Sequence, residues 1–307
     1  RDPRVFVIGE DVAEAGTPFK VLTGLVAEFG PERVIDSPIS EAGITGLATG
    51  AAMTGLRPVV DIMFGDFITL AMDQIANQAA KVHYMSGGKL RVPLVVRTTL
   101  GATRRSAAQH SQSLHAWVSH IPGLKGALPS TPHDAKGLLK SAIRDNNPVI
   151  FIESETLYGI KGEVPEDPEF TIPLGRAEIR REGSDVTVVA YMGMLYRAME
   201  VAEELERGDG ISVEIVDPRT LRPMDKDTII GSARKTHRVV VVEAGAGFAG
   251  MGSEIAAFIT EEAFDELDAP VERVTGANAP MPYAKNLEQL KTPSKEKIAE
   301  AIRRVCA

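Results

Sequence analysis

Short apolar runs recur along this chain, and most of them are separated by stretches with helical spacing. In the first half, the runs fall at residues 5–8, 34–35, 59–63, 92–96 and 149–152, with helical stretches near 20–29, 41–55, 67–85 and 133–144. Strands that alternate with helices are typical of parallel sheets covered by helices, and not of a sandwich of two antiparallel sheets. The sequence therefore predicts an α/β fold.

A second series of runs follows a change in character near the middle of the chain. Residues 157–183 lack helical periodicity and are rich in glycine, proline and charge, which marks a connector. Strand-like runs then fall at 186–191, 213–216, 239–242 and 271–274, with helices near 194–206, 225–235 and 252–266 and an apolar helical stripe in 294–305. We expect two doubly wound domains, a larger one over residues 1–175 and a smaller one over residues 184–307.

The composition excludes several classes of protein. A chain of 307 residues with 44% hydrophobic content can bury the cores of about two domains. Its formal charge of −8 argues against binding to nucleic acid, because contact with a phosphate backbone needs a basic face. The single cysteine, Cys306, cannot build a disulfide framework or a cysteine-rich metal site. No apolar run reaches the roughly 18 residues of a membrane span.

One stretch, residues 36–43, leads from a short strand through a turn into a helix rich in small residues. Pro38 prevents regular helix, Ser40 is a good N-cap, and Glu41 falls in the first helical turn. On local pattern alone, Glu41 is an acid that complements the helix dipole. The glycines and alanines that follow would let another helix approach closely, so we expect a large or tightly docked neighbour there.

A polar segment at residues 97–112 follows a predicted strand and should lie at its carboxyl end. Ligands of open α/β sheets bind at that end, so His110 is a candidate acid, base or hydrogen-bonding group. A histidine that merely decorates a surface loop is the alternative. His115 and His120 follow at intervals of five residues, which gives no shared helical face and argues against a metal site.

Two further features allow either a functional or an ordinary structural interpretation. Phe64 and Phe67 end another predicted strand and could stack on a flat ligand ring, although most such aromatics belong to a core. The helix 133–144 ends with unpaired carbonyl groups and with Asp145 beside them, before a proline. Such an end could hold a monovalent cation, and an ordinary helix stop has the same pattern.

Two glycine patterns point to other functions. Residues 245–250 follow a predicted strand and precede a helix, which is a weak match to a dinucleotide-binding turn. The next strand, at 271–274, is not followed by the acid that should bind a ribose hydroxyl. Residues 208–210, Gly-Asp-Gly, lie between a predicted helix and a predicted strand, and a tight turn explains them.

Seven motifs, each unspecific by itself, together resemble a known family. They are Gly-Glu-Asp-Val at 9–12, Asp-Ser-Pro-Ile-Ser-Glu at 36–41, Tyr-Met-Ser-Gly-Gly at 84–88, Ala-Gln-His-Ser-Gln at 108–112, Pro-Gly-Leu-Lys at 122–125, Asp-Pro-Arg-Thr-Leu at 217–221 and Pro-Met-Pro-Tyr at 280–283. The family is the beta subunit of the thiamin-diphosphate-dependent, decarboxylating component of 2-oxo acid dehydrogenase complexes, as in pyruvate and acetoin dehydrogenases. The resemblance covers nearly the whole chain and implies a transketolase-like fold, with a pyrimidine-binding domain followed by a smaller C-terminal domain.

The resemblance implies roles for the candidate residues. Glu41 would hydrogen-bond the ring nitrogen of the aminopyrimidine of thiamin diphosphate, and so favour the imino tautomer that removes the proton of the thiazolium carbon. Phe67 would stack on the aminopyrimidine, with Phe64 as the alternative. His110 would lie near the reacting carbon and assist acyl transfer. A potassium site of the family corresponds to Leu94, Ala142, Ile143, Asp145 and Asn147, mostly through backbone carbonyl groups.

The resemblance also implies partners. Enzymes of this kind hold the diphosphate through magnesium at a Gly-Asp-Gly followed by asparagines, and no such asparagines follow residues 208–210. The alpha subunit of the family supplies that half of the site with its magnesium, in a heterotetramer with sites at subunit interfaces. The acyl group passes to a lipoyl-bearing acyltransferase core. We expect no nucleic-acid and no membrane partner.

Pyruvate is the expected small 2-oxo acid substrate. Residues 222–225 and 282–287 look more like the pyruvate branch of the family than the branched-chain 2-oxo acid branch. Acetoin dehydrogenase is the nearest alternative, because residues 114–117 and 120–123 look similar to that branch too. Two alternatives of other classes are an NAD-binding dehydrogenase that uses residues 245–250 and a non-catalytic assembly scaffold.

Two expectations concern charge near the site and location. Arg104 and Arg105 make the loop before His110 unusually basic, and we interpret them as a solvated surface pair, with steering of an anionic substrate as the alternative. The chain starts at Arg1 without a methionine. We expect a cytoplasmic protein of a bacterium or archaeon, or a mitochondrial-matrix protein if a transit peptide has been removed.

Overall fold

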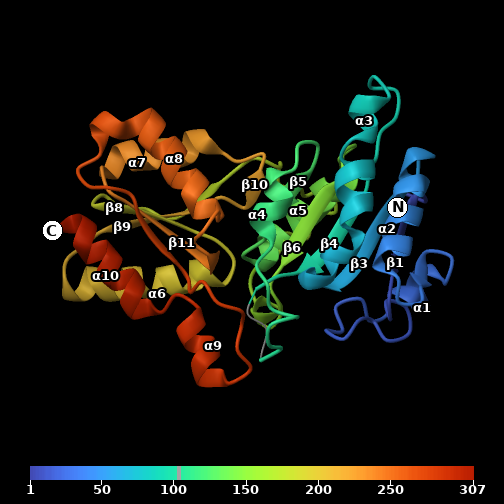
Figure 1. Cartoon of the computed structure of the whole chain (residues 1–307), viewed down its shortest axis with the longest axis horizontal. Coiled ribbons are helices and arrows are strands. Elements are labelled where there is room, and N and C mark those ends of the chain that lie inside the picture. Colours follow the sequence, from blue (N-terminus) through green and yellow to red (C-terminus); the bar gives the residue numbers. More distant parts are fainter. Residues whose placement is uncertain (102–104) are drawn as a thin grey trace.

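The computed structural model describes residues 1–101 and 105–307, and within them the chain forms two sheets (Figure 1). The first sheet contains β1 (Val5–Gly9), β2 (Val34–Asp36), β3 (Arg57–Phe64), β4 (Val95–Thr99), β5 (Lys125–Ala127), β6 (Val149–Glu153) and β10 (Thr220–Arg222). Its strand order is β10-β5-β6-β4-β3-β1-β2, and all neighbours except β10 and β5 are parallel. The α/β prediction is confirmed for this half.

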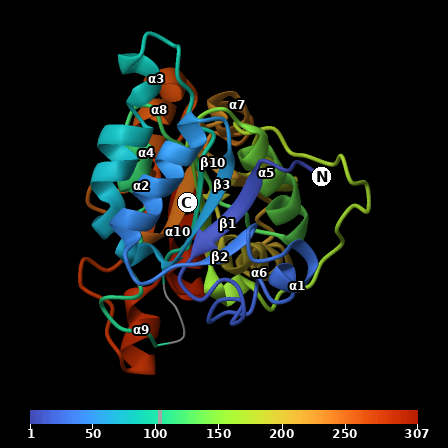
Figure 2. The same ribbon diagram turned by 90° about the vertical axis from the view of Figure 1, so that its right-hand side faces the viewer.

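Helices cover both faces of the first sheet (Figure 2). They are α1 (Leu25–Phe29), α2 (Glu41–Met53), η1 (Gly65–Ala71), η2 (Gln74–Ala79), α3 (Val82–Met85), α4 (His115–His120), α5 (Pro132–Arg144) and η3 (Glu155–Leu157). Ala48 of α2 belongs to the same buried cluster as Val60, whereas Leu138 of α5 belongs to the cluster of Val59. Because neighbouring residues of a strand point to opposite faces, α2 and α5 lie on opposite sides of β3.

Two predicted elements begin later than the sequence pattern indicates. The predicted helix 20–29 is helical only from Leu25, because Lys20 and Gly24 have φ angles of 61° and 91°, which do not continue a right-handed helix. The predicted strand 92–96 pairs only from Val95. Pro93 lacks a backbone N–H, so the chain cannot join the ladder there.

The predicted helix 67–85 is wrong as a single element. The structure divides it into the 3₁₀ turn η1, the π-helical turn η2 and the short helix α3. At the start of this region the chain needs Gly65, since a Cβ atom there would lie 2.6 Å from the Thr99 carbonyl oxygen and would also meet the Leu100 side chain. The short elements β5 and α4 were not predicted, because three to six residues carry too little periodicity.

The second sheet is smaller and is wound on both faces. It contains β7 (Glu178–Arg181), β8 (Val186–Ala190), β9 (Val213–Asp217), β11 (Val239–Ala246) and β12 (Glu272–Gly276), in the order β12-β11-β8-β9-β7. Its helices are α6 (Gly193–Gly208), α7 (Lys226–Thr236), α8 (Met251–Ala263), η4 (Phe264–Glu266), α9 (Lys285–Lys291) and α10 (Lys295–Cys306). Figure 1 shows α7 and α8 on one face and α6 and α10 on the other, and the two buried clusters divide in the same way. The predicted doubly wound fold is therefore confirmed.

Two short strands connect the halves in a way that the sequence did not predict. β10 comes from the second half of the chain but pairs antiparallel with β5, at the edge of the first sheet. Beside this pair, the Leu128 N–H donates to the Arg219 carbonyl at 2.7 Å. The unpredicted β7 lies within the expected connector and pairs antiparallel with β9. The domain ranges 1–175 and 184–307 stay a prediction. Among the helices of residues 1–101 and 105–307, none is long and apolar enough to cross a membrane.

A buried carboxylate joins the two halves. Asp134 lies in the first turn of α5 with no exposed surface, and Thr131 caps the helix by accepting from its N–H at 3.2 Å. Two arginines from the second half pair with Asp134: Arg219, at 2.9 Å, and Arg180. Arg180 also pairs with Asp217 at 3.1 Å. Burial of a carboxylate is tolerated because these guanidinium groups compensate its charge.

Replacement of Asp134 should therefore weaken the contact between the halves. We expect Asp134→Asn to lower the free energy of unfolding by about 3–5 kcal/mol, because Arg180 and Arg219 lose a charged partner at a site closed to water. Thermal melts of the purified protein would measure the effect as a fall in Tm.

Asp209→Asn provides a matched control. Asp209 pairs with Arg303 at 2.7 Å, but both side chains are substantially exposed, so we expect less than about 1 kcal/mol. Equal changes of Tm in the two variants would contradict the role given to the buried carboxylate.

Candidate active site

The carboxyl ends of β2, β3 and β4 form one edge of the first sheet. The strands are parallel and end at Asp36, Phe64 and Thr99 respectively, so the segments that follow them emerge side by side. Open α/β sheets bind ligands at this edge. The stretches that carry Glu41, Phe67 and His110 are these same following segments.

Glu41 is the first residue of α2, as the sequence predicted. The Ser40 side chain caps the helix by accepting from the Gly43 N–H at 3.3 Å, and Glu41 is half-buried in the first turn. A second carboxyl group is close by: burial, Asp11 and Glu41 together raise the pKa of Glu10. Like charges so close together disfavour the ionised form of Glu10.

Phe64, Phe67 and His110 come together in one ring cluster. The His110 ring lies edge-on to Phe64, with centroids 4.7 Å apart, and to Phe67, with centroids 5.2 Å apart. Phe64 and Phe67 are 6.1 Å apart at an interplanar angle of 80°, and Phe19 packs on Phe64 from the other side at 5.4 Å. The structure thus brings three of the predicted site residues into contact, on η1, β3 and the loop after β4. α2 packs against η1, so Glu41 belongs to the same edge.

The loop of His110 is held by a residue that the sequence analysis did not single out. Asp66 Oδ1 accepts hydrogen bonds from the backbone and side-chain nitrogens of Gln112, at 3.2 and 2.9 Å. The Gly101 N–H donates to the Gln112 carbonyl at 3.0 Å. Arg104, one of the two basic residues noted in this loop, lies outside the described residues. Arg105 is exposed, as expected of a surface residue.

A buried charged network lies below the ring cluster and was also missed. Arg97 pairs with Asp61 and with Glu153, and the Tyr158 hydroxyl donates to Glu153 at 2.6 Å. Burial raises the pKa of Asp61, although Arg97 acts in the opposite direction. The Tyr158 ring reaches Phe19, at 5.7 Å between centroids, and so connects the network to the cluster. The sequence did contain a signal for this network: Asp61 lies inside a predicted apolar strand, and a buried charge must be paired.

The residues proposed for potassium come together at the opposite edge of the sheet, where α5 ends and β4 begins. Their oxygen atoms already accept hydrogen bonds: Arg57 donates to the carbonyls of Ile143 and Asp145 at 2.8 and 2.9 Å, and the Leu94 carbonyl accepts from the Val149 N–H. Burial acts to raise the pKa of Asp145, but hydrogen bonds from Lys125 and Asn147 lower it overall. An ion bound here would share these oxygens with Arg57, through the second lone pair of each carbonyl.

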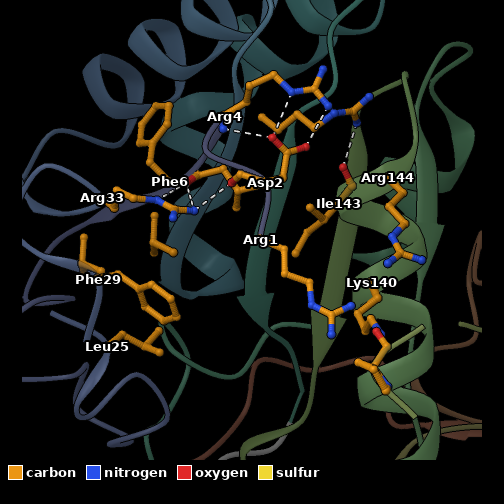
Figure 3. Close-up of a pocket in the computed structure, with 15 residues that line it drawn as sticks. Arg1, Asp2, Arg4, Phe6, Leu25, Phe29, Arg33, Lys140, Ile143 and Arg144 are labelled. Carbon is orange, nitrogen blue, oxygen red and sulfur yellow. Dashed lines mark hydrogen bonds and ion pairs between the residues drawn. The ribbon is translucent and has the colours of Figure 1, made fainter. Parts of the chain in front are cut away.

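A cavity of about 440 Å³ lies at the same, amino-terminal edge (Figure 3). Its lining includes five arginines and one lysine but a single aspartate, over an apolar floor. Figure 3 shows Phe6 and Phe29 on one side of the cavity and Lys140 and Arg144 on the other. Because Val5 and Arg57 begin their strands here, this cavity is separate from the candidate active site.

The glycine-rich turn at residues 245–250 does not offer a dinucleotide site. Glu243 Oε1 accepts from the Gly252 N–H of α8 at 2.9 Å, and a Cβ atom at Gly250 would lie 2.5 Å from the same oxygen. The carboxylate therefore occupies the start of the helix, where a pyrophosphate would otherwise bind. Its other oxygen lies 3.2 Å from His115 Nε2 and 3.2 Å from the Tyr191 hydroxyl.

Comparison with known proteins agrees with this geometry. The transketolase pyrimidine-binding domain matches residues 1–161, and the transketolase C-terminal domain matches residues 175–298. A solved structure described as a split-gene transketolase, inactive beta4 tetramer, has a TM-score of 0.79 at 24% identity and covers 99% of this chain and 92% of that chain. The fold and the site define a transketolase-like protein with a pyrimidine-binding domain.

Curated relatives narrow the family further. The chain is 52% identical to the pyruvate dehydrogenase E1 component subunit beta of Rickettsia felis over 306 residues, which are 100% of this chain and 93% of the relative. It is 53% identical to that of Rhizobium meliloti, over 98% of this chain and 65% of the relative, and 49% identical to the mitochondrial beta-2 subunit of rice, over 99% and 82%. The chain belongs to the family of pyruvate dehydrogenase E1 beta subunits, and the predicted resemblance is confirmed.

The contacts of Glu243 predict a pH-dependent stability. Burial acts to raise the pKa of Glu243, but hydrogen bonds from His115, Gly252 and Tyr191 lower it overall, so the unfolded chain binds more protons in acid. The stabilisation by this carboxylate is complete above its ordinary pKa of 4.5 and is lost as the pH falls through the lower value of the folded state. We expect Glu243→Gln to lower Tm near pH 7 and the deficit to shrink below about pH 4.

Glu254→Gln, an exposed position on α8, is the control for this series. Melts of both variants and the parent chain between about pH 3 and pH 7 would measure the difference. A deficit of Glu243→Gln that stays constant or grows in acid would contradict the assignment.

Proposed function

We propose that this chain is the beta subunit of a heterotetrameric pyruvate dehydrogenase, which decarboxylates pyruvate with thiamin diphosphate and transfers the acetyl group to a lipoyl domain of the acyltransferase. The observation that carries the proposal is the similarity, along the whole chain, to pyruvate dehydrogenase E1 beta subunits of bacteria and plants. The site supports it, because a carboxyl at a helix start and a cluster of rings lie at the ligand-binding edge of the sheet. The chain is then an oxidoreductase that is active only with its alpha subunit.

Glu41 is the proposed proton-holding group. Thiamin diphosphate, when bound, supplies a carbon nucleophile and an electron sink for decarboxylation. Glu41 hydrogen-bonds the pyrimidine ring nitrogen and holds a proton there. Glu41 is half-buried in the first turn of α2, with the carboxyl of Glu10 nearby.

The ring cluster of Phe64, Phe67 and His110 is the proposed binding surface for the pyrimidine ring. Phe67 stacks on the pyrimidine ring, while Phe64 supports Phe67 and His110 from the side. His110 donates or accepts a hydrogen bond close to the reacting carbon during acyl transfer. All three side chains are half-buried, and apolar rings beside the imidazole strengthen its hydrogen bonds by lowering the local dielectric.

The phosphate half of the site is proposed to come from the alpha subunit. In residues 1–101 and 105–307, no three histidine, cysteine, aspartate or glutamate side chains are placed to hold a metal ion. Asp209 of the Gly-Asp-Gly turn is bonded to Arg303, which supports its reading as an ordinary turn. Magnesium and the diphosphate are proposed to be held by the partner, as the resemblance to the family implies. If the potassium site of the family is used, the ion would have a structural role, and two of its carbonyl ligands would also accept hydrogen bonds from Arg57.

Exposed apolar side chains support a partner beside the helices of the first domain. Tyr84 is 88% exposed and Leu47 is 58% exposed, although both are large and apolar. Ile39, Leu70 and Met85 are exposed on the same group of elements. A Cβ atom at Gly50 of α2 would meet nothing within 4 Å, which leaves room for a closely docked helix. Apolar surface of this kind is typical of an interface.

The proposed location follows from the assembly. A pyruvate dehydrogenase of a bacterium or archaeon would act in the cytoplasm, and that of a eukaryote in the mitochondrial matrix. The matched relatives include both bacterial subunits and subunits named mitochondrial. The proposed lipoyl-bearing acyltransferase would be present in the same compartment.

The proposal predicts that Glu41 is needed for cofactor activation and not for assembly. In the heterotetramer, we expect Glu41→Gln to slow hydrogen–deuterium exchange at the thiazolium carbon by about 10²-fold to 10⁴-fold, because the amide cannot hold the proton. Tm and co-purification with the alpha subunit should not change.

Glu14→Gln, at an exposed carboxyl near the same edge, is the control. In this variant the thiazolium carbon should exchange at the rate of the parent enzyme. Exchange at the parent rate in Glu41→Gln would refute the role of Glu41. Full turnover of pyruvate after Glu41→Ala would favour the assembly scaffold.

The two phenylalanines should differ in their effect on the cofactor. We expect Phe67→Leu to weaken thiamin diphosphate binding by about twofold to tenfold, the range of one aromatic stacking contact, and Phe64→Leu to weaken it less. Cofactor titrations of the two heterotetramers would measure Kd. The reverse order would make Phe64 the stacking ring.

A further inference from the structure

We propose that His115 is a positioning residue, which fixes the loop of His110 by docking its far end on the second domain. The inference rests on the proposed role of His110 in acyl transfer. The similarity of the chain to its relatives does not specify this role of His115, Tyr191 and Glu243.

His115 is placed to act through the loop and not on the substrate. It starts α4, five residues after His110, and is only 4% exposed. Its ring contact is with Tyr191, edge-on at 5.6 Å between centroids, and not with the phenylalanines that surround His110. His115 is therefore placed beside the second domain.

The docking contact is a closed triangle of polar groups between the domains. His115 Nε2 lies 3.2 Å from Glu243 Oε2 and 3.0 Å from the Tyr191 hydroxyl, which itself donates to Glu243 Oε2 at 3.2 Å. The other oxygen of Glu243 accepts from the Gly252 N–H at 2.9 Å. Glu243 is fully buried, so loss of a partner removes part of the compensation for its charge in an environment of low dielectric.

Two cavities border the loop, so polar contacts contribute to holding it. One cavity of about 350 Å³ is lined by Ser111, Gln112 and Ser113 with residues of the second domain. Another, of about 360 Å³, is lined by Ser113 and His115 together with Tyr191. Leu114 packs against the core of the first domain, and the polar contacts of Gln112 and His115 further restrict the loop where the cavities leave space.

Two anchors follow His110 along the loop. Gln112 ties the loop to Asp66, beside Phe67, and His115 ties it to Glu243 of the second sheet. The second anchor adds a contact with the second domain to the packing of Leu114 on the first. With both, the imidazole is held against its two rings, and a misplacement of about 1 Å at a reacting group can cost about 10²-fold in rate.

The test separates positioning from simple structural support. In the heterotetramer, pyruvate decarboxylation is followed with an artificial electron acceptor, and acyl transfer is followed as reductive acetylation of a lipoyl domain. We expect His115→Leu to lower kcat of acetylation at least about tenfold and to change decarboxylation less than about twofold. His115→Gln, which keeps a hydrogen bond to Glu243, should restore most of the loss.

The controls make each outcome decisive. His120→Leu, at the exposed end of the same helix, should behave as the parent enzyme. In a His110→Ala background, His115→Leu should add little further loss, because the two residues act as a unit.

If His110→Ala loses acetylation and His115→Leu does not, the positioning role is wrong while the proposed role of His110 stands. If neither variant loses acetylation, the positioning role of His115 and the proposed role of His110 are both wrong. An equal fall of both half-reactions in His115→Leu, without rescue by His115→Gln, would make His115 a structural residue only and would overturn the inference.

Discussion

The parallel alignment of β1, β2, β3 and β4 is the constraint on which the site depends. Parallel strands end at the same edge of a sheet, so the segments after Asp36, Phe64 and Thr99 meet although they are far apart in the sequence. Each segment brings one kind of side chain to this edge: a carboxyl at a helix start, a pair of rings, or an imidazole. The turn at Gly65 and the cap at Ser40 then set the direction of each segment. The chemistry of the site is thus a consequence of strand direction.

Buried charges determine how the strands and the two sheets fit together. Arg97 bridges Asp61 and Glu153 across three neighbouring strands, and Asp134 holds arginines from the second half of the chain. Burial of an ion is costly unless a partner compensates it, so an arrangement that separated these groups would be strongly disfavoured. Apolar packing alone tolerates many small shifts, whereas a buried ion pair tolerates few. The charged networks therefore restrict the relative position of elements that carry the site.

The second domain contributes to the site without supplying a reacting group. Its glycine-rich turn is filled by Glu243, and that carboxylate reaches His115 at the end of the active-site loop. β10 adds a backbone connection between the same two parts. Such a rigid frame would suit the proposed arrangement, in which another polypeptide completes the cofactor site, because a partner can then bind a surface that is already in its final shape.

The sequence by itself determined the α/β class, the cap at Ser40, the first-turn position of Glu41 and the family, because these depend on neighbouring residues or on motifs that can be read along the chain. Local periodicity also indicated the long helices α5, α6 and α10. Only the tertiary structure decided the pairing of β10 with β5, the break of the predicted helix 67–85, and the contacts of His115 and Arg57. These features join residues that are distant in the sequence, and their free energy comes from burial and charge pairing that exist only once the sheets have formed.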